Sequence, residues 1–210
     1  GASLSGNATT NDTNIAYGNS VRYDSPSFDG FSGAVQVGFG ENKDLVGTAT
    51  GTNSADRGVS FNVKYENGPL GVVLAYQNDK ATVAAPDTKI DGKTTAVGGY
   101  YDFGVAKLNL GYGQVKATAT DLATATSGST TARAYNIGVA VPVDAFTFVG
   151  QYTQSKVKGV SGNSKSFALE GRYALSKRTT AYVGYNNTKD DRAAAGIKSN
   201  RFGVGMRHVF

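Results

Sequence analysis

The 210-residue sequence predicts an all-β protein, a transmembrane up-and-down antiparallel β-barrel. Three observations predict this class. Apolar and polar side chains alternate over most of the chain, short and long connections alternate between these segments, and aromatic residues recur near the segment ends. No segment carries a sustained apolar stripe with a period of 3.6 residues, so helices are not expected.

The alternation predicts eleven strands. In the second, Val35, Val37 and Phe39 alternate with Gln36 and Gly38. Because β-branched and aromatic residues at period two are typical of half-buried strands, each similar run is interpreted as one strand. The expected strand centres lie near residues 21, 35, 62, 73, 98, 110, 137, 150, 170, 183 and 205.

The connections between these strands are expected to alternate in length. Short connections with Gly, Pro, Asp or Ser lie at residues 25–30, 66–69, 102–104, 142–144 and 176–177. Long polar connections are expected near residues 41–57, 79–93, 117–132, 156–165 and 188–198. The Ala-rich stretch 118–133 also holds Thr, Ser and Gly, which favours a loop over a helix. Short turns at one end, long loops at the other and strands of about ten residues are typical of an outer-membrane barrel.

Tyrosines flank the short turns and predict two aromatic girdles at the membrane interfaces. The six expected girdle residues are Tyr65, Tyr76, Tyr101, Tyr112, Tyr173 and Tyr185. A soluble β-sandwich with these tyrosines in its core is the alternative. It is less favoured, because a sandwich seldom keeps such a regular alternation of turns and loops over eleven strands.

Strand parity places the charges at the strand centres on one face only. A charge at the lipid midplane would cost about 2–4 kcal/mol, so a membrane barrel needs this segregation. The charged face would then line a water-filled lumen. Small residues on the same face, such as Gly71, Gly111 and Gly205, are expected to leave space in that lumen. The expected pore-lining residues are Arg22, Asp24, Lys64, Glu66, Asp102, Lys107, Glu170, Arg172, Arg201 and Arg207.

Six of these ten residues are basic and four are acidic, which predicts a preference for anions. The alternative is that the charges pair locally and only solvate the wall. Arg22 with Asp24 and Glu170 with Arg172 are plausible pairs of this kind.

The remaining composition argues against catalysis. There is no Cys, so disulfide scaffolds and thiolate chemistry are excluded. The single His208 falls on the outer face by parity, so a Ser–His hydrolase or a His-ligated metal site is not expected. We expect no enzyme activity, no cofactor and no metal; Asp190 and Asp191 are interpreted as a solvated loop tip. The net charge of 21 − 16 = +5 is not clustered with exposed aromatics, so no nucleic-acid partner is expected.

Four segments resemble the trimeric general porins of the β-proteobacterial type. They are Asn19–Pro26 with the following Phe28 and Gly30–Gly33, Tyr101–Leu108, Leu175–Thr179 and Gly203–Phe210. They span the chain and occur in the family's order. The resemblance implies a sixteen-stranded barrel in the Gram-negative outer membrane, a homotrimer, and passive diffusion of small hydrophilic solutes and ions. It also implies that Phe210 is the signal read by the outer-membrane assembly machinery. The alternative function is an adhesin or receptor barrel that acts through its long surface loops.

By this resemblance the chain corresponds to strands six to sixteen of a single barrel domain, and residues 1–15 to the returning end of the pore-constricting loop. Eleven strands is an odd number, whereas bacterial single-chain barrels use even numbers. We therefore expect the chain to be part of a longer barrel, with unpaired edges at residues 19–24 and 201–210. A barrel that closes with twelve strands is the alternative.

Overall fold

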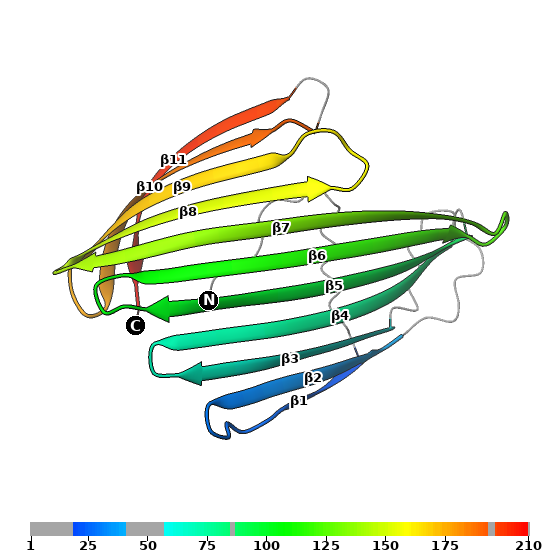
Figure 1. The fold of residues 1–210 in the computed structure, drawn as a ribbon, viewed down its shortest axis with the longest axis horizontal. Helices are drawn as coiled ribbons and strands as arrows, with labels where there is room; N and C mark the ends of the chain where they lie inside the picture. The colour runs from blue at the N-terminus through cyan, green and yellow to red at the C-terminus, as the bar shows by residue number, and fades with distance from the viewer. Residues whose placement is uncertain (1–18, 41–56, 85–86, 193–195, 210) are drawn as a thin grey trace.

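The structure, a computed structural model, describes residues 19–40, 57–84, 87–192 and 196–209. In these ranges the regular structure consists of eleven β-strands (Figure 1). The strands, in chain order, are β1 (Asn19–Asp24), β2 (Phe31–Phe39), β3 (Arg57–Asn67), β4 (Leu70–Ala84), β5 (Asp87–Asp102), β6 (Lys107–Asp121), β7 (Thr126–Val143), β8 (Phe146–Val157), β9 (Ser164–Ala174), β10 (Thr179–Asp190) and β11 (Ile197–His208).

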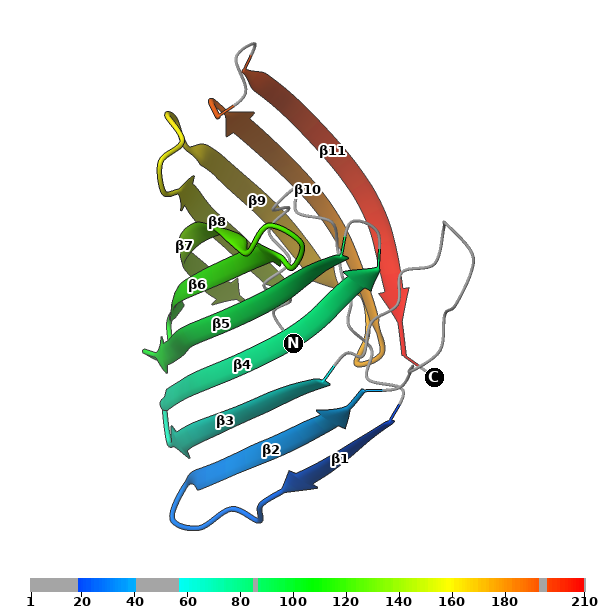
Figure 2. The same ribbon diagram turned by 90° about the vertical axis from the view of Figure 1, so that its right-hand side faces the viewer.

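All eleven strands belong to one sheet whose order in space is the order in sequence, β1 to β11. Each strand is antiparallel to its neighbours, so the sheet is an uninterrupted meander. The sheet curls strongly, and β1 and β11 form its two edges (Figure 2). The predicted strand number and the up-and-down topology are confirmed. Closure with twelve strands does not occur among the described residues, because β1 and β11 do not pair.

Two of the predicted long loops are wrong. Residues 79–93 and 117–132 lie mostly in strands, because β4 and β5 pair as far as Ala84 and Asp87, and β6 and β7 as far as Asp121 and Thr126. Thr and Ser supply the β-propensity, and the hydroxyls of Thr120 and Ser127 lie 3.0 Å apart across the second hairpin. These hairpins make strands of 15 to 18 residues, longer than the expected ten.

The tip of the β6–β7 hairpin is closed by one carboxylate. Asp121 Oδ1 accepts hydrogen bonds from the backbone N–H groups of Ala123 and Thr124, at 2.8 and 3.1 Å. Ala125 completes the turn with a φ of 55°. This local side-chain-to-backbone bonding is typical of Asp in turns and stabilises the hairpin without a long loop.

The predicted short turns lie at the opposite end of the sheet. Gly68 and Pro69 alone connect β3 to β4, and Gly68 has a φ of 53°. The turn after β9 is held by Ser176 Oγ, which accepts hydrogen bonds from the N–H groups of Arg178 and Thr179 at 3.2 and 3.1 Å. Gly68 readily adopts a positive φ and the hydroxyl of Ser176 bonds to backbone N–H groups, so each residue type stabilises its turn.

The sheet is a single layer, and no hydrophobic core of buried side chains exists in the described ranges. Along β7 the apolar residues Tyr135, Ile137 and Val139 are exposed, whereas the intervening Asn136 and Gly138 are half-buried. The apolar side chains thus lie on the convex, more open face of the curled sheet. A soluble sandwich would bury these side chains under a second sheet, which the described residues do not form. Within the same ranges no helix is long and apolar enough to cross a membrane.

The two edges predict that residues 1–210 alone do not form a stable channel. β1 and β11 would each present unpaired backbone N–H and C=O groups to lipid, and each unsatisfied group costs several kcal/mol. Planar-bilayer recordings with the purified chain are expected to show no long-lived conductance. Stable single-channel steps from a protein of 21.8 kDa would contradict this expectation.

The turn between β1 and β2 requires a glycine at position 30. Gly30 has a φ of +85°, and a Cβ there would lie 2.5 Å from the backbone oxygen of Glu66. Gly30→Ala is therefore expected to destabilise the folded protein by about 1–3 kcal/mol. Gly203→Ala is the control, because φ is ordinary there and no atom lies within 4 Å of the added Cβ. The measurement is the temperature at which the folded band disappears in detergent gels. Equal temperatures for both variants would contradict the prediction.

Candidate functional site

The strand register brings all ten predicted pore-lining residues to one face, which we call the polar face. Directly opposed residues of an antiparallel sheet point to the same side. Asp102 is directly opposite Lys107. Arg201 is directly opposite Asn186, and from Asn186 a continuous row of directly opposed residues crosses the strands to Tyr100 and Gly71. On this face, charged and hydroxyl side chains are interspersed with glycine and alanine.

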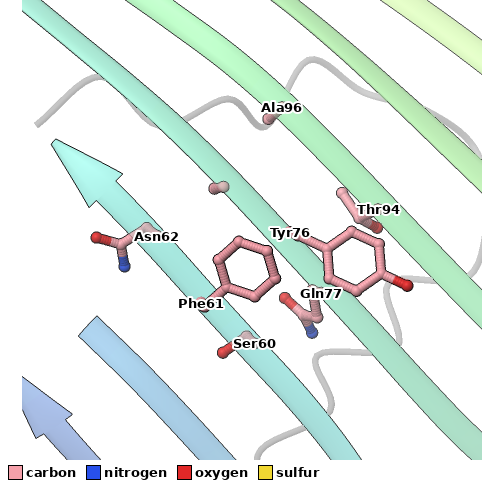
Figure 3. Close-up of a pocket in the computed structure, with 8 residues that line it drawn as sticks. Ser60, Phe61, Asn62, Tyr76, Gln77, Thr94 and Ala96 are labelled. Carbon is pink, nitrogen blue, oxygen red and sulfur yellow. The ribbon is translucent and has the colours of Figure 1, made fainter. Parts of the chain in front are cut away.

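The six predicted girdle tyrosines all lie on the opposite, apolar face. Several contact a second aromatic ring: Tyr65 lies 4.5 Å from Phe31 and Tyr173 lies 4.6 Å from Phe146, measured between ring centroids. Both pairs are near the short turns. Farther from the short turns, in the middle of β3 and β4, the rings of Phe61 and Tyr76 lie side by side, 5.5 Å apart, beside a shallow hollow of about 180 Å³ (Figure 3).

The other girdle tyrosines follow the same arrangement at the two heights. Tyr101 lies 4.7 Å from Phe103 at the short-turn end. Tyr112 is directly opposite Tyr135, and Tyr185 is directly opposite Phe202, and both pairs lie farther from the short turns, near the middle of their strands. The aromatic residues therefore form two bands on the apolar face. Aromatic side chains at two heights are typical of strands that cross a bilayer.

Both of the local ion pairs expected from the sequence are present. Arg22 Nη2 lies 2.7 Å from Asp24 Oδ1, and the guanidinium of Arg172 pairs with the carboxylate of Glu170. Both pairs join residues two positions apart on one strand. Of the ten residues, four basic and two acidic ones have no ion pair with another described residue.

Lys107 and Asp102 are directly opposed, yet each uses another contact. Lys107 Nζ lies 3.6 Å from the centroid of the Tyr100 ring, a cation–π contact. Asp102 Oδ1 accepts a hydrogen bond from the backbone N–H of Gly104 at 2.9 Å. Tyr100 Oη in turn lies 3.4 Å from Glu66 Oε1. A line of polar contacts therefore runs across β3 to β6 near the short turns.

Three glycines of the polar face are covered rather than open. A Cβ on Gly71 would lie 2.2 Å from the Tyr100 ring, and a Cβ on Gly205 would lie 2.4 Å from Tyr182 Oη. Asn136 Oδ1 covers Gly111 in the same way, at 2.2 Å. The expectation that these glycines leave free space is therefore wrong, because large side chains from the neighbouring strand lie flat over them. Tyr100 and Tyr182 are polar-face residues that the sequence reasoning missed, although strand parity could have found them.

The charges near β9 to β11 surround a groove of about 330 Å³. Glu170, Arg172 and Arg201 line it together with the amides of Gln151 and Asn186. A basic and amide lining of this kind can attract anions and hydrogen-bond to small hydrophilic solutes.

The remaining predicted positions are placed as follows. Arg207 is opposite Thr180, and Lys64 is opposite Ser32 and Val73, all on the polar face. His208 lies on the apolar face, where its Nδ1 is 2.9 Å from Thr179 Oγ1. Phe210 and residues 1–15, the predicted assembly signal and constricting-loop end, lie outside the described residues. In the described ranges no three His, Asp or Glu side chains gather as a metal site would require.

Comparisons with known proteins agree with this geometry. The family model described as Gram-negative porin matches residues 1–193. An outer membrane porin protein of Bordetella pertussis is 31% identical over 93% of this chain and 58% of its own length. Outer membrane porin protein 32 of Delftia acidovorans is 30% identical over 95% of this chain and 58% of its own length.

A solved structure extends the likeness to three dimensions. The anion-selective porin from Comamonas acidovorans matches with a TM-score of 0.74 at 28% identity, over 91% of this chain and 59% of that chain. The chain thus spans less than two thirds of the length of these relatives. Since the family is that of Gram-negative porins and the relatives are outer membrane proteins, the sheet lies in the outer membrane. The two-faced, eleven-stranded meander and the match over residues 1–193 together show that this chain belongs to the Gram-negative porin family.

Proposed function

We propose that the polar face lines the water-filled pore of an outer-membrane porin through which small hydrophilic solutes and ions diffuse passively, with a preference for anions. One observation carries the proposal. The register places the ten predicted charged residues on one face of the described strands, together with Asp79, Asp121 and Asp190 toward the long-connection end, while the opposite face has no charged residue between its two aromatic bands. One face therefore suits lipid and the other suits water.

Passive diffusion needs no catalytic group, because the width of the pore and the charges of its wall decide what passes. The chain therefore acts as a channel wall and not as an enzyme. The ten predicted lining residues carry 6 − 4 = +2 net charges, and the pairs Arg22–Asp24 and Arg172–Glu170 do not change this difference. Asp79, Asp121 and Asp190 share the face but lie toward the long-connection end of their strands, where Asp190 is paired with Arg192. An excess of positive charge on a pore wall raises the local concentration of anions.

The similar porin from Comamonas acidovorans is anion-selective, which supports the same preference for this chain. The resemblance to trimeric general porins supports a homotrimer in the outer membrane, and Phe210 is then the contact with the assembly machinery. We propose both the homotrimer and the contact with the assembly machinery for the full-length porin.

Removing two bases without an ion pair from the polar face should weaken the anion preference. In the full-length porin, Lys107→Gln with Arg201→Gln changes the charge of the ten predicted lining residues from 6 − 4 to 4 − 4. The zero-current potential across a bilayer in a KCl gradient is expected to move toward the value of a non-selective pore. Asp102→Asn should shift it in the opposite direction. Because the Debye length is about 10 Å at 0.1 M salt and about 3 Å at 1 M, all these preferences should weaken in concentrated salt.

The matched control removes two bases that lie at a short turn. Lys177→Gln with Arg178→Gln changes the net charge of the protein equally, but these exposed residues lie between β9 and β10 and outside the polar face of the strands. The control should keep the wild-type potential. A wild-type pore that selects cations would overturn the anion preference while leaving the channel intact.

A receptor or adhesin barrel is the second candidate function, and the long hairpins favour it. β6 and β7 pair from the short-turn end to Asp121 and Thr126, so their tip extends beyond the upper aromatic band. Exposed hairpins of this length offer a binding surface to another cell or molecule.

Liposome swelling separates the two candidates. Replacing residues 119–128 by Asn-Gly would join the opposed residues Thr118 and Ser129 by a two-residue turn. A porin should support the same swelling rate with small sugars before and after this change, because the pore wall is untouched. Absence of swelling with the intact protein would contradict the porin and favour a plugged receptor barrel.

A further inference from the structure

The groove on the polar face of β8 to β11 has an open floor of two glycines. Gly184 on β10 is directly opposite Gly203 on β11, and both line the groove. A Cβ on Gly203 would meet no atom within 4 Å, and a Cβ on Gly184 would meet its nearest atom at 3.7 Å. Gly71, Gly111 and Gly205, by contrast, are covered by large side chains. We call this hollow of about 330 Å³ the glycine groove.

The size and charge of the glycine groove suit one small monoanion. Sites for small molecules have volumes of roughly 300–1,000 Å³, and this groove lies at the lower end of that range. Its charged lining residues are Glu170, Arg172 and Arg201, which together carry 2 − 1 = +1. Because Arg172 pairs with Glu170, the charge of Arg201 is the one left without a counter-charge in the groove. One carboxylate of a bound solute would balance it.

Planar hydrogen-bonding groups surround the glycine floor. Arg172 donates its Nε hydrogen to Glu170 Oε1, which leaves the two terminal amino groups of the guanidinium and the other carboxylate oxygen for a solute. Asn186 Nδ2 donates to Ser166 Oγ at 2.9 Å, and Asn186 Oδ1 accepts from Thr188 Oγ1 at 3.0 Å, so this amide is held in place. Its second N–H can donate to a solute. Fixed groups that donate and accept side by side match the neighbouring hydroxyl groups of a sugar, since each hydroxyl does both.

Tyr182 adds a flat apolar surface at the short-turn end of the glycine groove. It lies two residues from Gly184 on β10 and directly opposite Arg172, and both of these residues line the groove. Its side chain lies across Gly205, where an added Cβ would be 2.4 Å from Tyr182 Oη and 2.6 Å from Cζ. Tyr182 nevertheless remains 40% exposed. The face of an aromatic ring carries partial negative charge, so it attracts the C–H groups on one side of a sugar ring.

Tyr100 shows the same arrangement over a glycine, but its ring is already occupied. It lies over Gly71, and Lys107 Nζ is 3.6 Å from the centroid of its ring. Tyr182 makes no ring–ring or cation–π contact with another described residue. Of these two rings, Tyr182 is therefore the one that a solute can contact, and Tyr100 is a natural control.

We propose that the glycine groove, together with Tyr182, binds sugar acids, which combine a pyranose ring with one carboxylate; this rests on the pore function proposed above. The sugar ring lies over Gly184 and Gly203 and against the Tyr182 ring, and its carboxylate pairs with Arg201. Arg201 lies two residues from Gly203, about 7 Å along the strand, a distance that its long side chain spans.

A site of this kind makes the pore selective for shape as well as for charge. The groove is open to the polar face, so a bound sugar acid keeps part of its hydration and leaves again. Transport through a pore needs binding that is strong enough for entry and weak enough for exit. Because the ring and the carboxylate are recognised by different residues, a simple inorganic anion gains only the contact with Arg201.

The test measures how sodium glucuronate lowers the ion current through the full-length porin in planar bilayers. A solute that occupies the pore reduces the conductance, and the concentration that gives half of the reduction reports its affinity. Glucose has the ring without the carboxylate, and acetate has the carboxylate without the ring. Glucuronate should bind about 10-fold more tightly than glucose, because it adds one charge-assisted pair. Acetate should cause no saturable reduction.

Three variants assign the contacts. Arg201→Gln should weaken glucuronate about 10-fold, to the level of glucose, and leave glucose unchanged. Tyr182→Leu should weaken both sugars about 3- to 10-fold, whereas the control Tyr100→Leu should weaken neither. Gly203→Leu places a side chain on the open floor and should abolish the reduction by either sugar. Single-channel steps without sugar report that each variant is folded.

Several results would overturn the proposal. They are equal affinities of the wild type for glucuronate and glucose, equal weakening by Tyr182→Leu and Tyr100→Leu, an unchanged affinity in Gly203→Leu, and a saturable reduction by acetate as strong as that by glucuronate. A wild type that conducts normally and does not respond to glucuronate would refute the sugar-acid site and leave the proposed pore intact. Absence of conductance in the wild type would instead contradict the pore itself.

Discussion

The backbone ladder between neighbouring strands is the interaction on which the whole structure depends. The described sheet has one layer and no buried core, so side-chain packing between layers contributes nothing to it. In lipid, where water cannot satisfy backbone groups, each inter-strand hydrogen bond replaces a cost of several kcal/mol. The register of this ladder also decides the role of each side chain. A slip by one residue would place Arg22 and Arg172 in the lipid and the tyrosines in the pore.

Because parity alone separates the two faces, the same residue type has different roles at neighbouring positions. In the proposed pore, the lysines and arginines of the polar face would line the path of solutes, whereas a second set of bases points to the apolar face. The two sets differ in face and also in height: Lys107 and Arg207 lie near the short turns, whereas Lys116 and Lys198 lie near the long connections. The net charge of +5 therefore combines charges on two opposite faces, which its value does not reveal.

Period-two alternation was sufficient to predict eleven strands, their order and the face of every predicted pore residue, because the contrast between lipid and water imposes that pattern. Where the contrast ends, the prediction failed. Beyond the upper aromatic band the β6–β7 hairpin has Thr, Ser and Ala on its faces, so residues 117–132 resembled a loop. The basic residues of the apolar face were missed for the same reason: Lys80, Lys165 and Lys198 fall in segments interpreted as loops. The rings over Gly71 and Gly205 depend on neighbours in space, which no local pattern encodes.

The two ion pairs of the polar face lie along their strands rather than across them, so neither fastens one strand to the next. Each is a small electric dipole parallel to the direction in which solutes would travel. On β1 the carboxylate of Asp24 is nearer the short-turn end, whereas on β9 the guanidinium of Arg172 is nearer that end. The two dipoles are therefore antiparallel, and their axial fields partly cancel. In a pore built on this wall, these two pairs would therefore contribute less to current rectification than two parallel dipoles would.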